Sequence, residues 1–532
     1  MNRFHFWGNA IGKPRAALRL TRAGAVVLCL LGAGAAIAIV NQFADLQRVD
    51  VVHNSAFPDH ADQLTIRGEP FAEVFEDGDE FFDTKFNALD GGGANVGGGQ
   101  RYTRTPRADR KGTGEWFNHL PARATGPNAA ACSDCHQEPG DGGGPAAANV
   151  HRDPLRNGNL GQFIERNTPH LFGQGGMQVL AEEMTEALQA QRDTARQQAC
   201  TRGTFTQALS AKGVSFGSIT ANRTVPFPCQ VTFVTSGVSG VATDLVVRPF
   251  QWKGVVAFIR DFGRGASHNE LGLTPDELLA NPDADSDGDG ITHEATVGDM
   301  TALAVYLAGQ PRPTMLTELN SLGLLTTPLT LAQINAINRG AALFNSAAAG
   351  CASCHVPQLT VDNSVFFEPS QNPNYRDATF PGGGNPLTFG LDPNAANRVN
   401  LTTDIIDNPT PIPGGTTLGN FRRNTQGQAI VELFGDLKRH NMGSGLAESV
   451  DEAGTGAGTF LTENLWGVGS TAPYLHDGRA TTLAEAILEH GGEAQNSANF
   501  FRSAADAART NPSDTRAADL IAALNNLVLF MQ

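Results

Sequence analysis

Charged and aromatic residues are scarce in this sequence, making up only 17% and 7% of its 532 residues. Basic residues are the scarcer charged class, with 38 lysines and arginines against 54 aspartates and glutamates, so the formal net charge is -16. This excess of acid argues against nucleic acid as a partner, because phosphate binding needs a basic surface. The composition also excludes a coiled coil, a collagen-like chain and a polytopic membrane protein.

What the sequence does contain suits a globular protein with long loops. It has 60 glycines and 29 prolines, and 40% of its residues are hydrophobic, which is enough to build cores. The length corresponds to roughly two to four domains of ordinary size.

A long hydrophobic run, residues 23–40, follows a basic stretch without acidic side chains at residues 1–22. This layout is typical of an export signal. The run exceeds the usual core of a signal peptide and reaches the lower limit for a membrane-spanning helix. We therefore predict that residues 23–40 anchor the chain in the inner membrane and that the rest is periplasmic or otherwise extracytoplasmic. A cleaved signal is the alternative, with Ala36-Ile37-Ala38 as one match to a cleavage site.

The sequence has only seven cysteines, and four of them lie in two copies of the motif C-x-x-C-H. The copies are Cys132-Ser-Asp-Cys135-His136 and Cys351-Ala-Ser-Cys354-His355. This motif is typical of c-type haem attachment, because two thiols add to the haem vinyl groups and the adjacent histidine reaches the iron. A zinc knuckle or a redox pair is the alternative, but two such motifs in an exported chain predict two covalently bound c-type haems. Cys200 and Cys229 are candidates for a disulfide in an oxidising compartment, which sequence alone does not establish.

Helical patterns are clearest in the second half of the chain. Thr330-Leu-Ala-Gln333 and Thr482-Leu-Ala-Glu485 are capping boxes, each of which predicts a helix start. An apolar stripe after Thr330 leads into the second haem motif, and a final helix is expected from about residue 514. Glycine at position 340 would allow the two helices to cross closely.

The first half gives weaker signals. Residues 41–130 show no helical period, residues 200–250 are expected to be irregular or short strands, and residues 311–328 form a predicted linker. Helices are expected at residues 176–199, 252–262 and 299–308. We predict a mainly α fold with two cytochrome c-like haem domains, long loops and insertions, plus an N-terminal hydrophobic helix. The predicted divisions are residues 1–45 (export signal or anchor), 46–320 (N-terminal haem domain) and 321–532 (C-terminal cytochrome c domain).

Two distant C-x-x-C-H motifs and the late segment Pro473-Tyr-Leu-His476-Asp-Gly-Arg479-Ala resemble the di-haem peroxidase superfamily. This group includes bacterial di-haem cytochrome c peroxidases and MauG-type enzymes. The resemblance covers about residues 115–532 and is closer to the di-haem oxidoreductase branch, often labelled "thiol oxidoreductase". The stretches that match this branch are Thr168–Gly173, Arg248–Lys253, Asp285–Glu294, Val297–Asp299, Gln310–Pro313 and His490–Glu493.

His355 is the expected proximal ligand of the C-terminal haem, by its own motif. The candidates for the opposite side of the iron are His440, Met442, His476 and His490. We predict His490, which shares a face with apolar residues of the helix expected after Thr482. His490 also lies fourteen residues after His476, where the resemblance implies a methionine ligand in the peroxidases and a tyrosine in the MauG type.

A bis-histidine haem would have a lower potential than a histidine–methionine haem. Met442 is the competing ligand, and a core histidine bonded to a backbone carbonyl is the alternative role for His490. The resemblance implies that His476 and Arg479 contact the haem edge or its propionates instead.

His136 is the expected proximal ligand of the N-terminal haem, and no motif supplies an opposite ligand. His151 and His170 are the nearest candidates, each of which could equally be a solvated loop histidine. An open position on the iron is what peroxide or oxygen chemistry requires, so we assign catalysis to this haem and electron transfer to the other. Trp252 could relay an electron between them, with a core tryptophan as the alternative.

An acidic segment fits the calcium-loop pattern D-x-D-x-D-G-x5-E. Its candidate ligands are Asp283, Asp285, Asp287, Asp289 and Glu294. A second register begins at Asp285, and a solvated acidic turn is the alternative. We predict calcium, because so many carboxylates repel one another without a cation.

Together these features predict an exported di-haem c-type oxidoreductase of the peroxidase type. Its expected partner is a small electron-transfer protein, a cytochrome or cupredoxin, or a small-molecule substrate. The alternatives are a di-haem oxygenase that cleaves an apolar substrate and an electron-transfer cytochrome without enzymatic activity.

Overall fold

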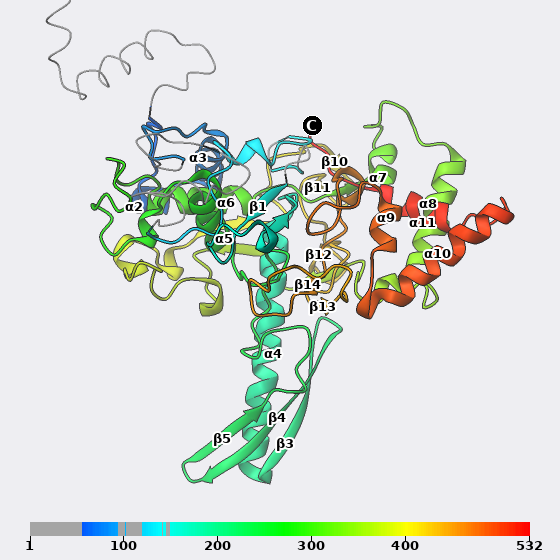
Figure 1. Cartoon of the computed structure of the whole chain (residues 1–532), viewed down its shortest axis with the longest axis horizontal. Helices are drawn as coiled ribbons and strands as arrows, with labels where there is room; N and C mark the ends of the chain where they lie inside the picture. The colour runs from blue at the N-terminus through cyan, green and yellow to red at the C-terminus, as the bar shows by residue number, and fades with distance from the viewer. Residues whose placement is uncertain (1–55, 94–101, 103–119, 141, 145–148) are drawn as a thin grey trace, which may run out of the picture. The chain divides into compact units, whose positions relative to one another are not determined.

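Helices and short β-sheets alternate along the chain in the computed structural model (Figure 1). The structure describes residues 56–93, 102, 120–140, 142–144 and 149–532. The predicted N-terminal anchor therefore lies outside the described residues. Within the described ranges, no helix combines the length and the apolar character that a membrane crossing requires. The predicted boundary near residue 320 stays a prediction.

The helices differ widely in length, from one turn to eight. The α-helices are α2 (Gln63–Ile66), α3 (Phe71–Asp83), α4 (Gln174–Arg202), α5 (Ile259–Ala266), α6 (Val297–Ala308), α7 (Leu316–Ser321), α8 (Leu331–Phe344), α9 (Leu483–Leu488), α10 (Gln495–Thr510) and α11 (Arg516–Asn525).

The strands form one three-stranded antiparallel sheet, β3-β4-β5, and several antiparallel pairs. The pairs are β1-β2, β6-β15, β7-β12, β8-β9, β10-β11 and β13-β14. The strands are β1 (Val150–Arg152), β2 (Ile164–Arg166), β3 (Thr204–Ala211), β4 (Val214–Pro226), β5 (Cys229–Val234), β6 (Thr314–Met315), β7 (Leu359–Val361), β8 (Val365–Glu368), β9 (Asn397–Asn400), β10 (Pro411–Ile412), β11 (Thr416–Thr417), β12 (Ala429–Val431), β13 (Arg439–Asn441), β14 (Thr459–Leu461) and β15 (Leu527–Val528).

The prediction of a mainly α fold is wrong. Helix accounts for only 34% of the structure, and strand accounts for 16% in several small sheets. Outside the sheet β3-β4-β5, the physical reason is that the long loops pair with one another in strands of two to four residues, which are too short to leave an alternating pattern in the sequence. The predicted N-terminal hydrophobic helix lies outside the described residues.

Several predicted helices are confirmed. Both capping boxes are present, with the hydroxyls of Thr330 and Thr482 accepting the backbone N–H three residues on. The helix expected at residues 252–262 begins only at Ile259, because the preceding residues form turns. Helix α3 was not predicted, although its phenylalanines at positions 71, 75, 81 and 82 recur at helical spacing.

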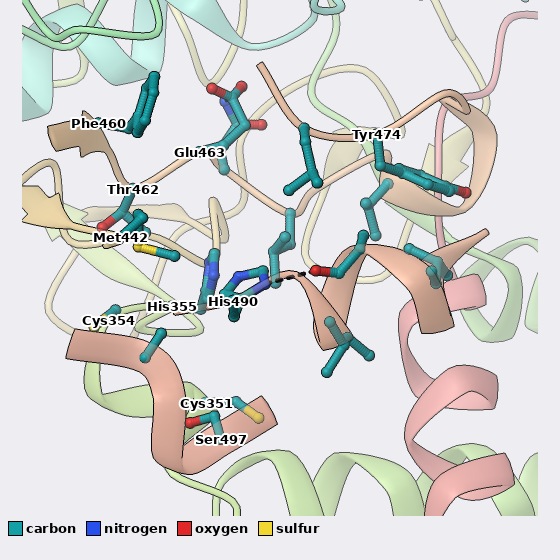
Figure 2. Close-up of a pocket in the computed structure, with 18 of the residues that line it drawn as sticks. Cys351, Cys354, His355, Met442, Phe460, Thr462, Glu463, Tyr474, His490 and Ser497 are labelled. Atoms are coloured by element: carbon teal, nitrogen blue, oxygen red, sulfur yellow. Dashed lines mark hydrogen bonds between the residues drawn. The ribbon is translucent and has the colours of Figure 1, made fainter. Parts of the chain in front are cut away.

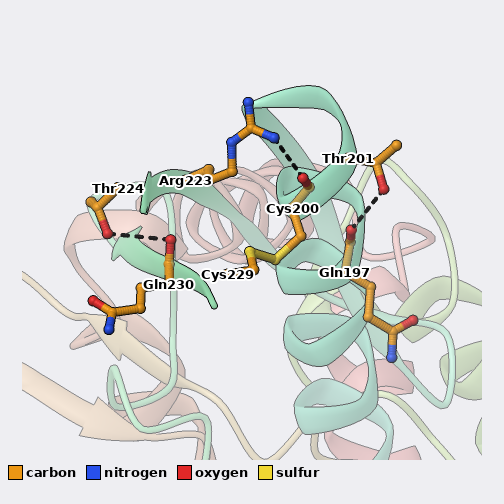
Figure 3. The surroundings of a disulfide bond; sticks show 7 residues. All are labelled: Gln197, Cys200, Thr201, Arg223, Thr224, Cys229 and Gln230. Carbon is orange, nitrogen blue, oxygen red and sulfur yellow. Dashed lines mark hydrogen bonds between the residues drawn. A yellow bond between two sulfur atoms is a disulfide. The ribbon is translucent and has the colours of Figure 1, made fainter. Parts of the chain in front are cut away.

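The C-terminal part of the long helix α4 and the sheet β3-β4-β5 form an arm, residues 189–234. This arm projects from the rest of the described chain (Figure 1). A disulfide between Cys200 and Cys229 joins the last turn of α4 to the start of β5 (Figure 3). The candidate disulfide is therefore present. Phe227, in the β4–β5 turn, is 92% exposed.

Two pairs of helices cross at a glycine. Helix α8 meets α11 at Gly340, where a Cβ atom would overlap the carbonyl group of Asp519. Helix α3 meets α6 at Gly78, where a Cβ atom would overlap the carbonyl group of Ala302. In both cases the absence of a side chain lets the two backbones approach closely. Every residue of α6 is buried, so this helix lies at the centre of the core around α3.

Candidate haem sites

The two C-x-x-C-H motifs adopt the same local fold. Each begins with a single 3-10 turn, Cys132–Asp134 in the first motif and Cys351–Ser353 in the second. In each, the backbone N–H of the histidine donates to the carbonyl group of the first cysteine, at 3.1 Å and 3.0 Å. None of the four motif cysteines is in a disulfide. Both motifs therefore keep their two cysteines together in one turn.

The second motif lines a cavity that also holds the ligand candidates Met442 and His490 (Figure 2). Cys351, Cys354 and His355 form part of its wall. The four residues that the sequence proposed for the opposite side of an iron all line the same cavity: His440, Met442, His476 and His490. The fold thus gathers the second motif and the four candidates, which span 139 positions from Cys351 to His490, around one cavity.

His355 and His490 lie side by side in this cavity (Figure 2), with ring centroids 6.4 Å apart. The Nδ1 atom of His355 is 3.1 Å from the carbonyl oxygen of Phe434, and that of His490 is 2.7 Å from the carbonyl oxygen of Ala486. Both carbonyls accept, so each Nδ1 carries the proton and each Nε2 keeps its lone pair. His490 lies just beyond the end of α9 rather than within it, and its bond to Ala486 fixes the ring.

Burial keeps both imidazoles neutral. Burial and, to a smaller extent, the neighbouring His490 together lower the pKa of His355 to about 4. Burial also lowers the pKa of His490, against the opposing effect of the Ala486 carbonyl. Neutral imidazole is the form that binds a metal ion.

Both ring nitrogens of His440 are bonded to carboxylates, so neither is available to bind a metal ion. Its Nε2 atom is 2.9 Å from an oxygen of Asp436, and its Nδ1 atom is 2.9 Å from an oxygen of Glu493. Burial alone would lower the pKa of His440, but hydrogen bonds to Asp436, Cys354 and Glu493 raise it to about 11. A protonated imidazole has no lone pair for a metal.

His476 lies in the cavity wall between two aromatic rings, whereas Arg479 does not line the cavity. The ring of His476 stacks on Phe460 at 4.3 Å and meets Trp252 edge-on at 6.5 Å. Arg479 instead pairs with Asp477 and donates to the carbonyl group of Gly445. The fold therefore brings His476, but not Arg479, to the cavity at the second motif.

Trp252 also lines this cavity. Its indole N–H donates to the carbonyl oxygen of Asn167 at 2.9 Å. The cavity wall continues from Asn167 through Thr168 and Pro169 to His170. Trp252 is thus fixed against the segment that leads towards the first motif.

The first motif is enclosed differently. Burial lowers the pKa of His136 to about 4, and the backbone carbonyls of Gly143 and Pro169 offset part of this effect. Its Nδ1 atom is buried and has no hydrogen-bond partner within the described ranges. The ring next to it is Phe82 of α3, with centroids 6.4 Å apart.

The two histidines considered as partners of His136 lie in different places. His170 is buried near His136, and its Nε2 atom is 2.8 Å from the carbonyl oxygen of Trp466. His151 lies on strand β1 and pairs with Glu165 on the surface. The structure therefore brings only His170, of these two, close to the first motif.

The acidic loop brings together part of its predicted ligand set. Carboxylate oxygens of Asp285, Asp287 and Asp289 lie within 4.8 Å of one another. The pKa of Glu294 is raised to about 10, mainly by burial and then by repulsion from Asp287 and Asp289. Asp283 is turned away and bonds to the Nε2 atom of His293 at 3.0 Å. This geometry favours the second register, which begins at Asp285.

Sequence reasoning missed one ionisable residue of the cavity, Glu463. Burial raises the pKa of this carboxyl group to about 7. It lines the cavity beside Thr462 (Figure 2). No motif marks it, because its environment depends on residues that are distant in the chain.

Residues 410–513 match the model of a protein family described as "Di-haem oxidoreductase, putative peroxidase". The matched segment contains His440, His476 and His490 and confirms the resemblance to the di-haem oxidoreductase branch. The family's description implies haem as the cofactor. No curated protein matches the chain.

Proposed function

We propose that the protein is an exported di-haem c-type oxidoreductase with peroxidase-like activity. Cys132 and Cys135 would hold one haem, and Cys351 and Cys354 the other. The proposal rests on two attachment turns of the same kind, whose cysteines are not in disulfides, together with the family match in the C-terminal half. Haem supplies the redox chemistry with peroxide, and the chain's residues decide which iron meets it.

The observation that carries the proposal is the pair His355 and His490. His355 and His490 would hold one haem iron through their Nε2 atoms. The two rings are 6.4 Å apart, and each is oriented by a backbone carbonyl at Nδ1. This arrangement suits two axial ligands and would close the second iron to substrates, leaving it an electron-transfer role.

The first site is the better candidate for catalysis. His136 is buried and neutral, which suits a proximal ligand, and its ring neighbour Phe82 has no donor atom. His170 donates from Nε2 to the Trp466 carbonyl, and its buried Nδ1 has no hydrogen-bond partner among the described residues, so this neutral ring is a candidate to act beside the first haem. Trp252 lies in the wall of the cavity at the second motif and donates to the carbonyl group of Asn167. This position suits an electron relay between the two sites.

The proposed location is the periplasm or another extracytoplasmic space, with residues 23–40 as the anchor. The disulfide between Cys200 and Cys229 supports an oxidising compartment. The acidic composition supports protein or small-molecule partners rather than nucleic acid. A small cytochrome or cupredoxin is the proposed electron donor.

We also propose a calcium ion at Asp285, Asp287 and Asp289, with Glu294 close by. Burial, and after it repulsion from neighbouring aspartates, raises the pKa values of Asp289 and Glu294, and a cation there would stabilise the charged carboxylates. Titration calorimetry should detect calcium binding at micromolar concentrations, and Asp287→Asn should weaken it strongly. Asp283→Asn is the matched control and should bind as the parent does. An absence of calcium heat in the parent would contradict this site.

The function is tested by the optical spectrum of the purified chain before and after hydrogen peroxide. We expect one high-spin and one low-spin haem, with peroxide changing the Soret and near-infrared bands. His136→Ala should abolish the reaction with peroxide, whereas His490→Ala should change its rate and intermediates. A spectrum that peroxide leaves unchanged would contradict a peroxidase. A stable oxygen complex with weak peroxide turnover would instead favour the oxygenase.

A further inference from the structure

A fully buried amide without hydrogen bonds lies near the first haem motif. Gln310 is 0% exposed, and both its Nε2 and its Oε1 atoms have no partner among the described residues. The Oε1 atom of Gln174 is also buried and without a partner in the described part of the chain. Leaving such a group unsatisfied costs about 1–3 kcal/mol, so native proteins usually supply a partner or a ligand.

The N-terminus of α4, which lies nearby, has no side-chain cap. This 29-residue helix begins at Gln174, and its N-cap, Gly173, offers no side chain to the free N–H groups. Its first turn is buried and contains no acidic residue. A buried helix start without a cap leaves N–H donors and the positive end of the helix dipole unbalanced. Together these groups favour a negatively charged oxygen.

Packing brings Gln310 to this helix start. A Cβ atom at Gly175 would lie 2.5 Å from the carbonyl oxygen of Ala308, and one at Gly173 would lie 3.3 Å from Pro313. The segment that carries Gln310 is therefore packed on the first turn of α4.

The same groups lie beside the first motif. A Cβ atom at Gly142 would overlap Oε1 of Gln310, so the amide lies against this glycine. The next residue, Gly143, places its carbonyl near the ring of His136. By contrast, neither Gln174 nor Gln310 lines the cavity at the second motif. The amide of Gln310 therefore lies beside the first motif.

We propose that Gln310 and the N-terminus of α4 bind a negatively charged oxygen of the first haem. The oxygen belongs either to a propionate carboxylate or to a ligand on the iron, and both would accept from the amide N–H and the helix N–H groups. This inference rests on the proposed function, because it requires a haem at Cys132 and Cys135. It gives roles to two sequence stretches, Thr168–Gly173 and Gln310–Pro313, that the proposed function leaves without one.

The test uses the di-haem protein with Gln310→Leu, which keeps the volume and removes both polar atoms. Gln178→Leu is the matched control, because Gln178 is a buried amide of the same helix whose oxygen and nitrogen both have protein partners. Two measurements are made on each variant: the midpoint potential of each haem, and the infrared stretch of carbon monoxide bound to the ferrous protein.

Each outcome has a defined meaning. A lower potential of the first haem in Gln310→Leu, with an unchanged carbon monoxide band, assigns the propionate, because an unbalanced carboxylate stabilises the ferric state. A carbon monoxide band moved to higher frequency assigns the iron ligand, which has lost its donor. If neither changes relative to Gln178→Leu, the inference is overturned. A parent protein with one haem would contradict the proposed function itself and the inference with it.

Discussion

The two haem motifs are built on the same plan up to the histidine. In each, a helix crosses a partner at a glycine, Gly78 in α3 and Gly340 in α8. Four residues later comes a phenylalanine whose ring lies 6.4 Å or 6.5 Å from the motif histidine, Phe82 and Phe344. The motif cysteines then follow in identical turns.

The difference lies in what faces the histidine from elsewhere in the chain. The ring of His355 contacts a second neutral imidazole, that of His490, whereas the ring contact of His136 within the described ranges is with Phe82, and the buried His170 lies near it. Under the proposed function, the motif marks where a haem would be attached, and residues far away in sequence would decide whether its iron is open. The comparison assigns the two sites to different tasks under the proposed function.

Removing the cysteines of one motif should have the largest effect. Cys351→Ala with Cys354→Ala should reduce the haem content from two per chain to one and leave a mainly high-spin spectrum. Cys132→Ala with Cys135→Ala should leave one haem with a low-spin spectrum. A haemochrome assay measures the content. Identical spectra from the two variants would mean that the sites do not differ as described.

Filling either helix crossing should have the next largest effect. Gly340→Ala and Gly78→Ala each force a methyl group into a backbone carbonyl, and we expect each to destabilise the fold by about 3 kcal/mol. Gly265→Ala in α5 is the matched control, because its Cβ atom would meet nothing within 4 Å. This control should be neutral or stabilise by roughly 0.5–1 kcal/mol. Thermal unfolding followed by circular dichroism compares the three variants.

A smaller effect should distinguish the second site by its pH dependence. The pKa of His440 is raised to about 11 in the folded chain, so folding favours its protonated form. Its contribution to stability is therefore complete below the ordinary histidine pKa of about 6.5 and declines as pH rises from there towards 11. The difference in unfolding free energy between the parent and His440→Gln should shrink over this range.

Denaturant unfolding at several pH values from 6 to about 10 measures this difference. Glu493→Gln removes one of the two carboxylates and should give a weaker slope than the parent. A difference that stays constant with pH would contradict the ion-paired state of His440.

Local signals in the sequence predicted the local parts of the structure. The capping boxes at Thr330 and Thr482, the close approach at Gly340 and the pair Cys200–Cys229 all depend on a few neighbouring residues or on simple exclusion. The fourteen-residue spacing from His476, which the resemblance supplied, pointed to His490; its role as a ligand stays a prediction, and the residue lies beyond the helix on which it was expected.

Features that depend on distant contacts could not be predicted in the same way. The bonds of His440 to Asp436 and Glu493, and the burial of Glu463 and Gln310, arise only when separate segments meet. The balance of helix and strand was wrong for the same reason, since most sheets join loops that leave no periodic pattern. Helix α3 is different, because its phenylalanine spacing was available in the sequence.

The central claim, that His490 closes the second iron, is tested most directly by electron paramagnetic resonance of the oxidised protein. The parent should contain one low-spin, six-coordinate haem, and His490→Ala should convert that haem to high spin. Met442→Leu, at the competing ligand in the same cavity, should leave the low-spin signal intact. A low-spin signal that survives in His490→Ala, or disappears in Met442→Leu, would contradict the account.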